Sequence, residues 1–469
     1  MSRASRLSGF TTAISGDTDL NVGIVTAQQL ITDQTFTFTN LNVTGIATVP
    51  VISGVTTIGS DVVVGGATTA LVVNGDARVT GILTVGTSSL TLNGTDGTVS
   101  GINTINGLTY PSAGSLSNRN LIINGAMNIA QRATSVTGIN DTTIRYATVD
   151  RGYHAFNSLG TWTSTQESDA PVGFSKSWKV ECTTADASPA TDDYAILVYR
   201  VEAQDLQILE YGNANAKTTT FSFYVKSNKT GTASFELSQS DNTAKQFITT
   251  YTINSADTWE YKTVVIPGDA SGVIDNNSGV GMQMAWWLNS GSKYTGEDST
   301  DVWEAANNDA RNNSNLGLGG AVNDYFQITG IQWEVGTRAT PFEHKTHADN
   351  LFDCQRYFQR IQAGRVNSPT IGYAESSQVV VQIPLHRTPR VPLAHDVSGR
   401  GTLTKVGDIA VNAFSSSTNN VTGIHFFASI GNALTLGLLT SGSFTNGDAE
   451  IIRYGNSGDQ VVLTLDTEI

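Results

Sequence analysis

A seven-residue pattern that recurs near the beginning of the chain limits what this region can fold into. The pattern runs apolar, Ser or Thr, Gly, apolar, variable, Thr, apolar. The residues after each Gly alternate between apolar and polar, which is the period of a half-buried strand, and the Gly permits a tight turn. One such strand cannot bury its apolar row alone, so the copies must stack or wrap identical chains around an axis. The four copies are Val43–Val49, Ile52–Ile58, Val79–Val85 and Val99–Ile105.

Residues 21–117 are therefore predicted to form a repetitive trimeric β shaft. The first 117 residues contain no Trp and no Lys, and their small β-branched residues around Gly suit a narrow shaft better than a globular core. A disordered Gly/Ser/Thr linker is the alternative. Residues 1–20 precede the repeats and are too short to fold alone, so we expect them to anchor the shaft to a partner through Arg3, Arg6 and Phe10.

A large globular domain is predicted for residues 118–345. All seven Trp of the chain lie between residues 162 and 333. Several runs in this region alternate sharply between apolar and polar residues and are separated by turn residues, which predicts an antiparallel β-sandwich. The clearest runs are Thr218–Lys226, Thr232–Ser238 and Trp259–Pro267.

Residues 346–365 are predicted to form a helical junction. Within them Leu351, Cys354, Phe358 and Ile361 recur at helical spacing. Three such helices side by side could clamp a trimer, and a single helix docked on its own sandwich would show the same pattern. The sequence leaves both arrangements open.

Residues 366–469 are predicted to form a second, small β domain, which makes the whole chain mainly β. His386, His395 and His425 lie in this region at wide and uneven separations that match no metal motif. Alternation returns most clearly in Ser377–Leu385 and Val461–Leu465.

Charge and cysteine content exclude several classes of protein. The formal net charge is −14 and no Lys/Arg cluster is interleaved with aromatic residues, so we expect no nucleic-acid partner. The first ten residues lack the apolar run of a signal peptide or membrane span, so membrane insertion is not expected.

Cys182 and Cys354 are too few for a disulfide framework and are expected to be buried. No common catalytic or phosphate-binding motif is present, so neither an enzyme nor a cofactor is expected.

Motifs at both ends of the predicted sandwich resemble a known family. Asn120–Arg132, followed by Val149–Tyr153, resembles the opening of a domain found in many phage tail fibres, and Phe326–His344, with Cys354–Gln359, is similar to how that domain closes. The repeats resemble those of fibres from marine cyanobacterial phages. The resemblance implies a jelly-roll-like, carbohydrate-binding sandwich in a homotrimer. Gly152 departs from the family, which more often has Trp after Asp-Arg, so no packing or sugar-contact role of that Trp is carried over.

Four aromatic residues are the predicted sugar-binding site. Their flat faces suit the C–H face of a pyranose, although by alternation one of two adjacent Trp residues should face the core. The four are Trp286, Trp287, Tyr294 and Trp303.

An acidic stretch nearby supports a different hypothesis. Glycoside hydrolysis needs two carboxylates several ångströms apart, and Glu297, Asp298, Asp301 and Glu304 could supply them. A tailspike that depolymerises polysaccharide is therefore the alternative to a binding protein. A solvated loop explains the same residues more simply.

These features together predict a virion tail fibre made in the host cytoplasm. Its N-terminal end would attach to a tail, baseplate or adaptor protein, and its C-terminal domains would bind a host surface receptor, most simply a glycan. Several weak sites on one trimer would raise the avidity of attachment. A head or collar fibre, or a connector that docks on another virion protein, is a further alternative.

Overall fold

The computed structural model describes residues 117–390 except 142–145, 242–243, 297–300, 364–369 and 376–377, together with strands between 82 and 109, strands between 402 and 454, and residues 461–468. The chain divides into two compact units, residues 1–82 and 83–469. The predicted anchor residues Arg3, Arg6 and Phe10, and most of the predicted shaft, lie outside the described residues.

Short antiparallel pairings are present where the repeats end. The copies at 79–85 and 99–105 both contribute strands, as the alternation predicts. Strands β1, β2 and β3 form one small sheet and β4 pairs with β5. Their bounds are β1 Ile82–Val85, β2 Leu90–Asn93, β3 Thr98–Ser100, β4 Thr104–Ile105 and β5 Leu108–Thr109.

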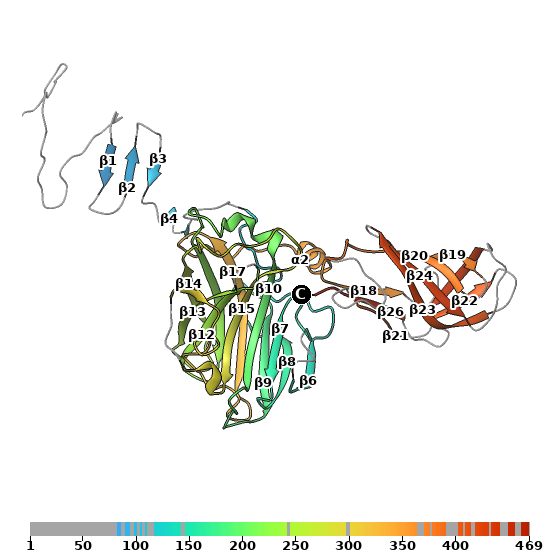
Figure 1. The fold of residues 1–469 in the computed structure, drawn as a ribbon, viewed down its shortest axis with the longest axis horizontal. Coiled ribbons are helices and arrows are strands. Elements are labelled where there is room, and N and C mark those ends of the chain that lie inside the picture. Colours follow the sequence, from blue (N-terminus) through green and yellow to red (C-terminus); the bar gives the residue numbers. More distant parts are fainter. Residues whose placement is uncertain are drawn as a thin grey trace, which may run out of the picture. The chain divides into compact units, whose positions relative to one another are not determined.

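Two antiparallel sheets of six strands each form a β-sandwich (Figure 1), which confirms the predicted fold class. The predicted runs at 218–226, 232–238 and 259–267 correspond to β11, β12 and β14. The first sheet has the order β16 (Trp303–Ala305), β13 (Lys245–Ile253), β12 (Gly231–Gln239), β15 (Val280–Ser290), β10 (Tyr194–Glu202) and β7 (Tyr153–Asn157). The second has the order β14 (Glu260–Ile266), β11 (Thr219–Ser227), β17 (Tyr325–Val335), β9 (Ser177–Thr184), β8 (Thr161–Glu167) and β6 (Ser135–Ile139).

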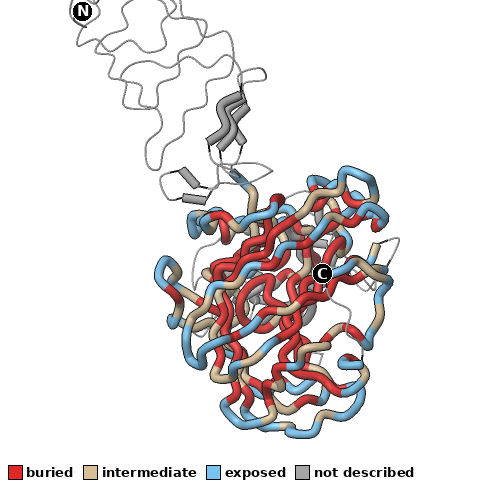
Figure 2. Tube along the Cα trace, turned by 90° about the vertical axis from the view of Figure 1, so that its left-hand side faces the viewer, coloured by how far each residue is buried: buried red, intermediate tan, exposed pale blue. Residues whose placement is uncertain are grey.

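Aromatic side chains fill the space between the two sheets. Trp286 of the first sheet packs on Phe235 at 5.2 Å between ring centroids, and Phe221 stacks on Trp333 within the second sheet at 5.1 Å. Each fully buried side chain of this size contributes about 1.5–3 kcal/mol. Figure 2 shows that buried residues follow the strands of the sandwich and exposed residues follow the connecting loops. Cys182 and Cys354 are both buried and free, as predicted.

The predicted helix is present but shorter than its periodicity suggests. Helix α2 spans His347–Cys354, and the side chain of Thr346 caps its first turn by accepting a hydrogen bond from the Asp349 backbone N–H. The prediction of helix as far as Ile361 was wrong, because Phe358–Ala363 forms strand β18. This strand pairs with β26 (Val461–Asp466), about a hundred residues away. The spacing of apolar residues within one segment does not indicate a partner so remote in sequence.

The remainder of the chain is also antiparallel β structure. Strand β26 lies between β18 and β21 (Thr402–Val406) in a three-stranded sheet. Six further strands close into a ring, and the predicted strands at 377–385 and 461–465 are confirmed as β20 and β26. The ring has the order β19 (Thr370–Glu375), β20 (Gln378–Pro384), β24 (Ala433–Thr440), β23 (Thr418–Ile430), β22 (Ile409–Ala413) and β25 (Ala449–Tyr454).

A buried ion pair fastens the residues after β26 to the sandwich. Arg151 pairs with Glu468, and their side chains are only 1% and 3% exposed. Arg151 also lies over the ring of Tyr357, 3.5 Å from its centroid, and donates to the Arg200 carbonyl. Burial acts to lower the pKa of Arg151, but the Glu468 carboxylate and the neighbouring tyrosines together outweigh it and raise the pKa, so the guanidinium stays charged. Arg132 adds a second contact to Glu468 at 3.5 Å.

The position of Gly152 beside this pair explains one departure from the tail-fibre motif. A Cβ atom at Gly152 would lie 2.8 Å from Val149 Cγ2 and 3.1 Å from Trp178 Cζ3. The Trp178 ring therefore occupies the space next to the Asp-Arg dipeptide in this chain, and a larger side chain at residue 152 would have to displace it.

Replacing Glu468 by Gln is expected to destabilise this junction by about 3 kcal/mol, because Arg151 would remain buried without its counter-charge. Denaturant unfolding of the full-length protein measures the loss. Asp192→Asn is the control, since Asp192 and Lys293 form an exposed ion pair, 67% and 41% exposed; its cost should stay below about 0.5 kcal/mol. Equal effects of the two substitutions would show that the buried pair does not fasten the junction.

Glu260, next to the turn between β13 and β14, makes the free energy of unfolding of the sandwich depend on pH in the acid range. Burial acts to raise the pKa of Glu260, but hydrogen bonds from Lys262, Ser255 and Asn254 lower it to about 2. A lowered pKa stabilises the fold above the ordinary Glu value, and this contribution is lost as pH falls from about 4.5 towards 2. Glu260→Gln should therefore cost about 1 kcal/mol at pH 7, allowing for solvent screening, and almost nothing near pH 2. Urea unfolding of both proteins across this range tests it, and a difference independent of pH would contradict it.

Candidate functional site

Aromatic side chains gather on the outer face of the first sheet because its strands alternate. On β10, Ala195 and Leu197 face the core whereas Ile196 and Val198 face outwards. The same alternation on β15 turns Trp286 inwards and Trp287 outwards. The register places Trp287 opposite Ile196, so the outward residues of β15, β10 and β7 form one continuous surface.

These residues line a cavity of about 280 Å³, which we call the Trp287 pocket. The ring centroids of Trp287 and Tyr294 are 5.2 Å apart, and Tyr194 meets Tyr294 edge-on at 5.6 Å. Tyr294 ends the short 3-10 helix η2 (Ser292–Tyr294) that follows β15, so this turn closes one side of the sheet surface. The pocket combines this aromatic wall with polar groups from neighbouring strands, and its lining includes Tyr153, Tyr194, Arg200, Gln283, Trp287, Tyr294 and Arg311.

A buried carboxylate fixes the polar side of the Trp287 pocket. Glu236 of β12 is 1% exposed and accepts hydrogen bonds from Trp287 Nε1 at 2.8 Å and from Arg311 Nη1 at 2.7 Å. On the next strands, Arg200 Nε donates to Gln283 Oε1 at 2.8 Å. A buried charge is tolerated only when it is paired, so Glu236 holds both the indole and the guanidinium in place.

One side chain that lines the pocket has a buried polar atom without a described partner. Arg311 Nε is buried and forms no hydrogen bond with the residues that the structure describes; the same holds for Asn312 Oδ1 and Asn313 Nδ2, on neighbouring residues that do not line the pocket. Such atoms are costly unless water or a ligand satisfies them. The pocket therefore offers flat rings, amides and guanidinium groups, and these suit a ligand with both C–H faces and hydroxyl groups.

The structure brings together two of the four aromatic residues that the sequence predicts. Trp287 and Tyr294 meet in the Trp287 pocket, where they are only 2% and 9% exposed, whereas Trp286 is 1% exposed and lies between the two sheets. Tyr194, which is half-buried, presents more of its ring to the pocket than Trp287 does. Trp303 belongs to edge strand β16, packs on Tyr211 and Phe247, and donates to the Pro267 carbonyl. Alternation therefore assigned one Trp of the adjacent pair to the core, as expected, and Trp303 lies apart from the pocket.

Sequence reasoning missed most of the polar residues of the pocket. Arg200 and Gln283 face outwards at positions that alternation along β10 and β15 would indicate, but only the register shows that they are opposite each other. Glu236 and Arg311 meet across 75 positions of sequence. No local pattern reports such a contact.

The acidic stretch is only partly described. Glu297 and Asp298 lie outside the described residues. The backbone N–H of Asp301 donates to the Ile248 carbonyl, and Glu304 accepts a hydrogen bond from Gln246 at 2.8 Å. Within the described part of the chain no group of three or more His, Cys, Asp or Glu residues could hold a metal ion. No described helix is long and apolar enough to cross a membrane.

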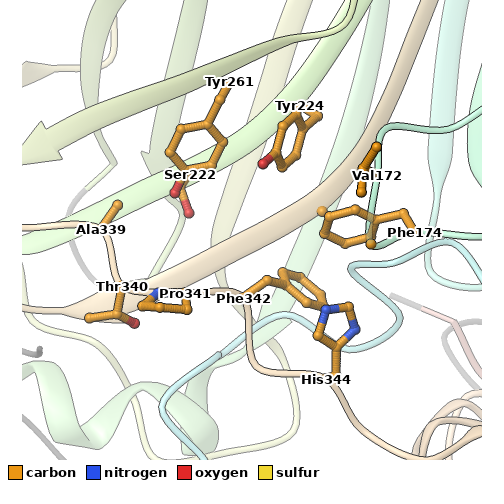
Figure 3. Close-up of a pocket in the computed structure, with 12 residues that line it drawn as sticks. Val172, Phe174, Ser222, Tyr224, Tyr261, Ala339, Thr340, Pro341, Phe342 and His344 are labelled. Carbon is orange, nitrogen blue, oxygen red and sulfur yellow. The ribbon is translucent and has the colours of Figure 1, made fainter. Parts of the chain in front are cut away.

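A second cavity, of about 400 Å³, lies on the second sheet and is called the Tyr261 pocket (Figure 3). Tyr224 of β11 and Tyr261 of β14 form one wall, with ring centroids 4.9 Å apart. Phe174 continues this wall, with its ring centroid 5.5 Å from that of Tyr224, and packs edge-on against Phe342 at 5.0 Å. The described residues that line this cavity include no Asp, Glu, Lys or Arg, in contrast to those of the Trp287 pocket.

No protein-family model and no curated protein sequence matches the chain. Among solved structures it is similar to the enzymatically active domain of bacteriophage CBA120 tailspike protein 4, with 13% identity, a TM-score of 0.27 and coverage of 48% of this chain and 24% of that chain. It is also similar to the family 11 carbohydrate-binding module of the cellulase Lic26A-Cel5E of Clostridium thermocellum, with 15% identity, a TM-score of 0.23 and coverage of 45% and 98%. The CBM22-1 xylan-binding domain of Paenibacillus barcinonensis Xyn10C has 8% identity, a TM-score of 0.22 and coverage of 44% and 94%.

Proposed function

We propose that this chain is a phage virion tail fibre that binds a host surface glycan through the Trp287 pocket. The observation that carries the proposal is the pocket itself, where the rings of Trp287, Tyr294 and Tyr194 lie beside the bonded side chains of Glu236 and Arg311. Because protein contacts already fix these side chains, little conformational entropy is lost when a ligand binds.

The Trp287 pocket suits a glycan better than the Tyr261 pocket does. A sugar hydroxyl both donates and accepts hydrogen bonds, and the Trp287 pocket offers the amides of Gln283 and Asn308 in addition to guanidinium donors. The Tyr261 pocket offers aromatic rings, hydroxyls and one imidazole. The proposal includes no enzymatic step and no cofactor.

The assembly part of the proposal depends on the sequence repeats. Their short alternating strands need neighbours to bury an apolar row, and three chains around one axis would supply them. The fibre would be a homotrimer attached to the tail by its N-terminal end, with the sandwich and the residues after it directed to the host. Several weak glycan sites per fibre would then act together.

Tyr194→Ala is expected to weaken glycan binding about tenfold, because it removes a half-buried ring from the wall of the pocket. A glycan array identifies the best ligand of the full-length protein, and calorimetric titration with that ligand compares the variants. Tyr261→Ala is the matched control, since it removes a ring of the same kind from the other sheet. Undiminished binding by Tyr194→Ala, or an equal loss with Tyr261→Ala, would exclude the Trp287 pocket as the glycan site.

The full-length protein is expected to have the mass of three chains in solution, and a chain that begins at Ser117 is expected to lose much of this association. Light scattering after size-exclusion chromatography measures both masses. A monodisperse, folded monomer of full length would contradict the fibre and would favour a carbohydrate-binding protein that acts outside a virion.

A further inference from the structure

The two guanidinium groups of the Trp287 pocket are in different electrostatic situations. Arg311 is paired with the carboxylate of Glu236, 2.7 Å away. Arg200 has no ion pair with any residue that the structure describes. Its Nε donates to the neutral amide of Gln283, and its guanidinium carbon lies 4.7 Å from the centroid of the Tyr153 ring. Arg200 therefore brings an uncompensated positive charge to the pocket.

The described residues of the lining add no carboxylate that would offset the charge of Arg200. They include Arg200 and Arg311 but no Asp or Glu, and since Glu236 pairs with Arg311, the positive charge of this lining comes from Arg200. The bond to Gln283 and the contact with Tyr153 fix the plane of the Arg200 guanidinium. Nη1 and Nη2 form no hydrogen bond with a described residue, so they present a pair of parallel donors. A planar fork of this kind matches a carboxylate, phosphate or sulfate group, which can accept two hydrogen bonds at once.

From this arrangement we infer that the ligand of the Trp287 pocket is an acidic glycan, whose anionic group binds the Arg200 fork while a neighbouring sugar ring packs on Tyr194. The inference rests on the proposed function and specifies its ligand class. Carboxylate, sulfate and phosphate share the required geometry, and the experiment distinguishes them.

Three pairs of probes test the inference, and the members of each pair share a sugar but differ in charge. They are oligogalacturonate and its methyl ester, dextran sulfate and dextran, and mannose 6-phosphate and mannose. The full-length protein is expected to bind the charged member of at least one pair about tenfold more tightly than its neutral twin. Raising the salt concentration should reduce this preference, because salt screens the charge of a solvent-exposed pocket.

Substitutions test whether Arg200 causes the preference for the charged probe. Arg200→Gln is expected to remove the preference for the charged twin, and binding of the neutral twin should fall far less, because the neutral twin loses one hydrogen-bond donor but no charge. Arg200→Lys keeps the charge but loses the fork, so it should restore the preference only in part. Arg338→Gln is the control, because Arg338 is exposed, does not line the pocket, and its loss changes the net charge equally.

The outcomes separate this inference from the proposed function. If binding of the neutral probes depends on Tyr194 and no charged probe binds better than its twin, the acidic class is overturned and glycan binding stands. If Arg338→Gln lowers the preference as much as Arg200→Gln does, the preference comes from the overall charge of the protein and not from two hydrogen bonds of the Arg200 guanidinium. If no probe, charged or neutral, binds in a way that depends on Tyr194, the proposed function and the inference both fail.

Discussion

The packing of aromatic rings between the two sheets is the interaction on which the outer surface depends. Trp286 packs on Phe223 and Phe235 in the core, and this contact fixes which face of β15 turns inwards. Because side chains alternate along a strand, the same contact turns Trp287 outwards. A shift of one residue in register would turn Trp287 towards the core and Trp286 outwards, and the Trp287 pocket would be lost. Core packing and the lining of the Trp287 pocket are therefore set by one alignment of strands.

The polar side of the pocket follows from the cost of burying a carboxylate. Glu236 is almost fully buried, so it needs hydrogen-bond donors, and it receives them from Trp287 and Arg311. These bonds restrict the rotamers of both donors before any ligand arrives. A side chain that is already fixed loses little entropy on binding. The stability of this buried group and the preorganisation of the pocket consequently have the same physical origin.

How much of this could be predicted from the sequence depends on the range of each interaction. Alternation within one strand is local, so β11, β12 and β14 were predicted correctly. Strand β18 was predicted as helix, because Phe358 and Ile361 continue the helical spacing of α2 while their partner strand β26 is remote in sequence. The residues of the Trp287 pocket were likewise predictable only where local alternation determines their position. The separation of Trp286 from Trp287 was predicted, whereas the convergence of Glu236, Arg311 and Arg200 depends on register and loop placement.

Strand β10 links the pocket to the junction with the residues after β26. Tyr194 and Arg200 line the pocket, and Glu202, two residues further on, pairs with Arg356 at 2.7 Å. The Arg200 carbonyl accepts a hydrogen bond from Arg151, the residue that also holds Glu468. Arg200 is thus fixed through its side chain on the pocket and through its backbone at the junction. Any change in how residues 466–468 dock would act on the same residue whose guanidinium lines the Trp287 pocket.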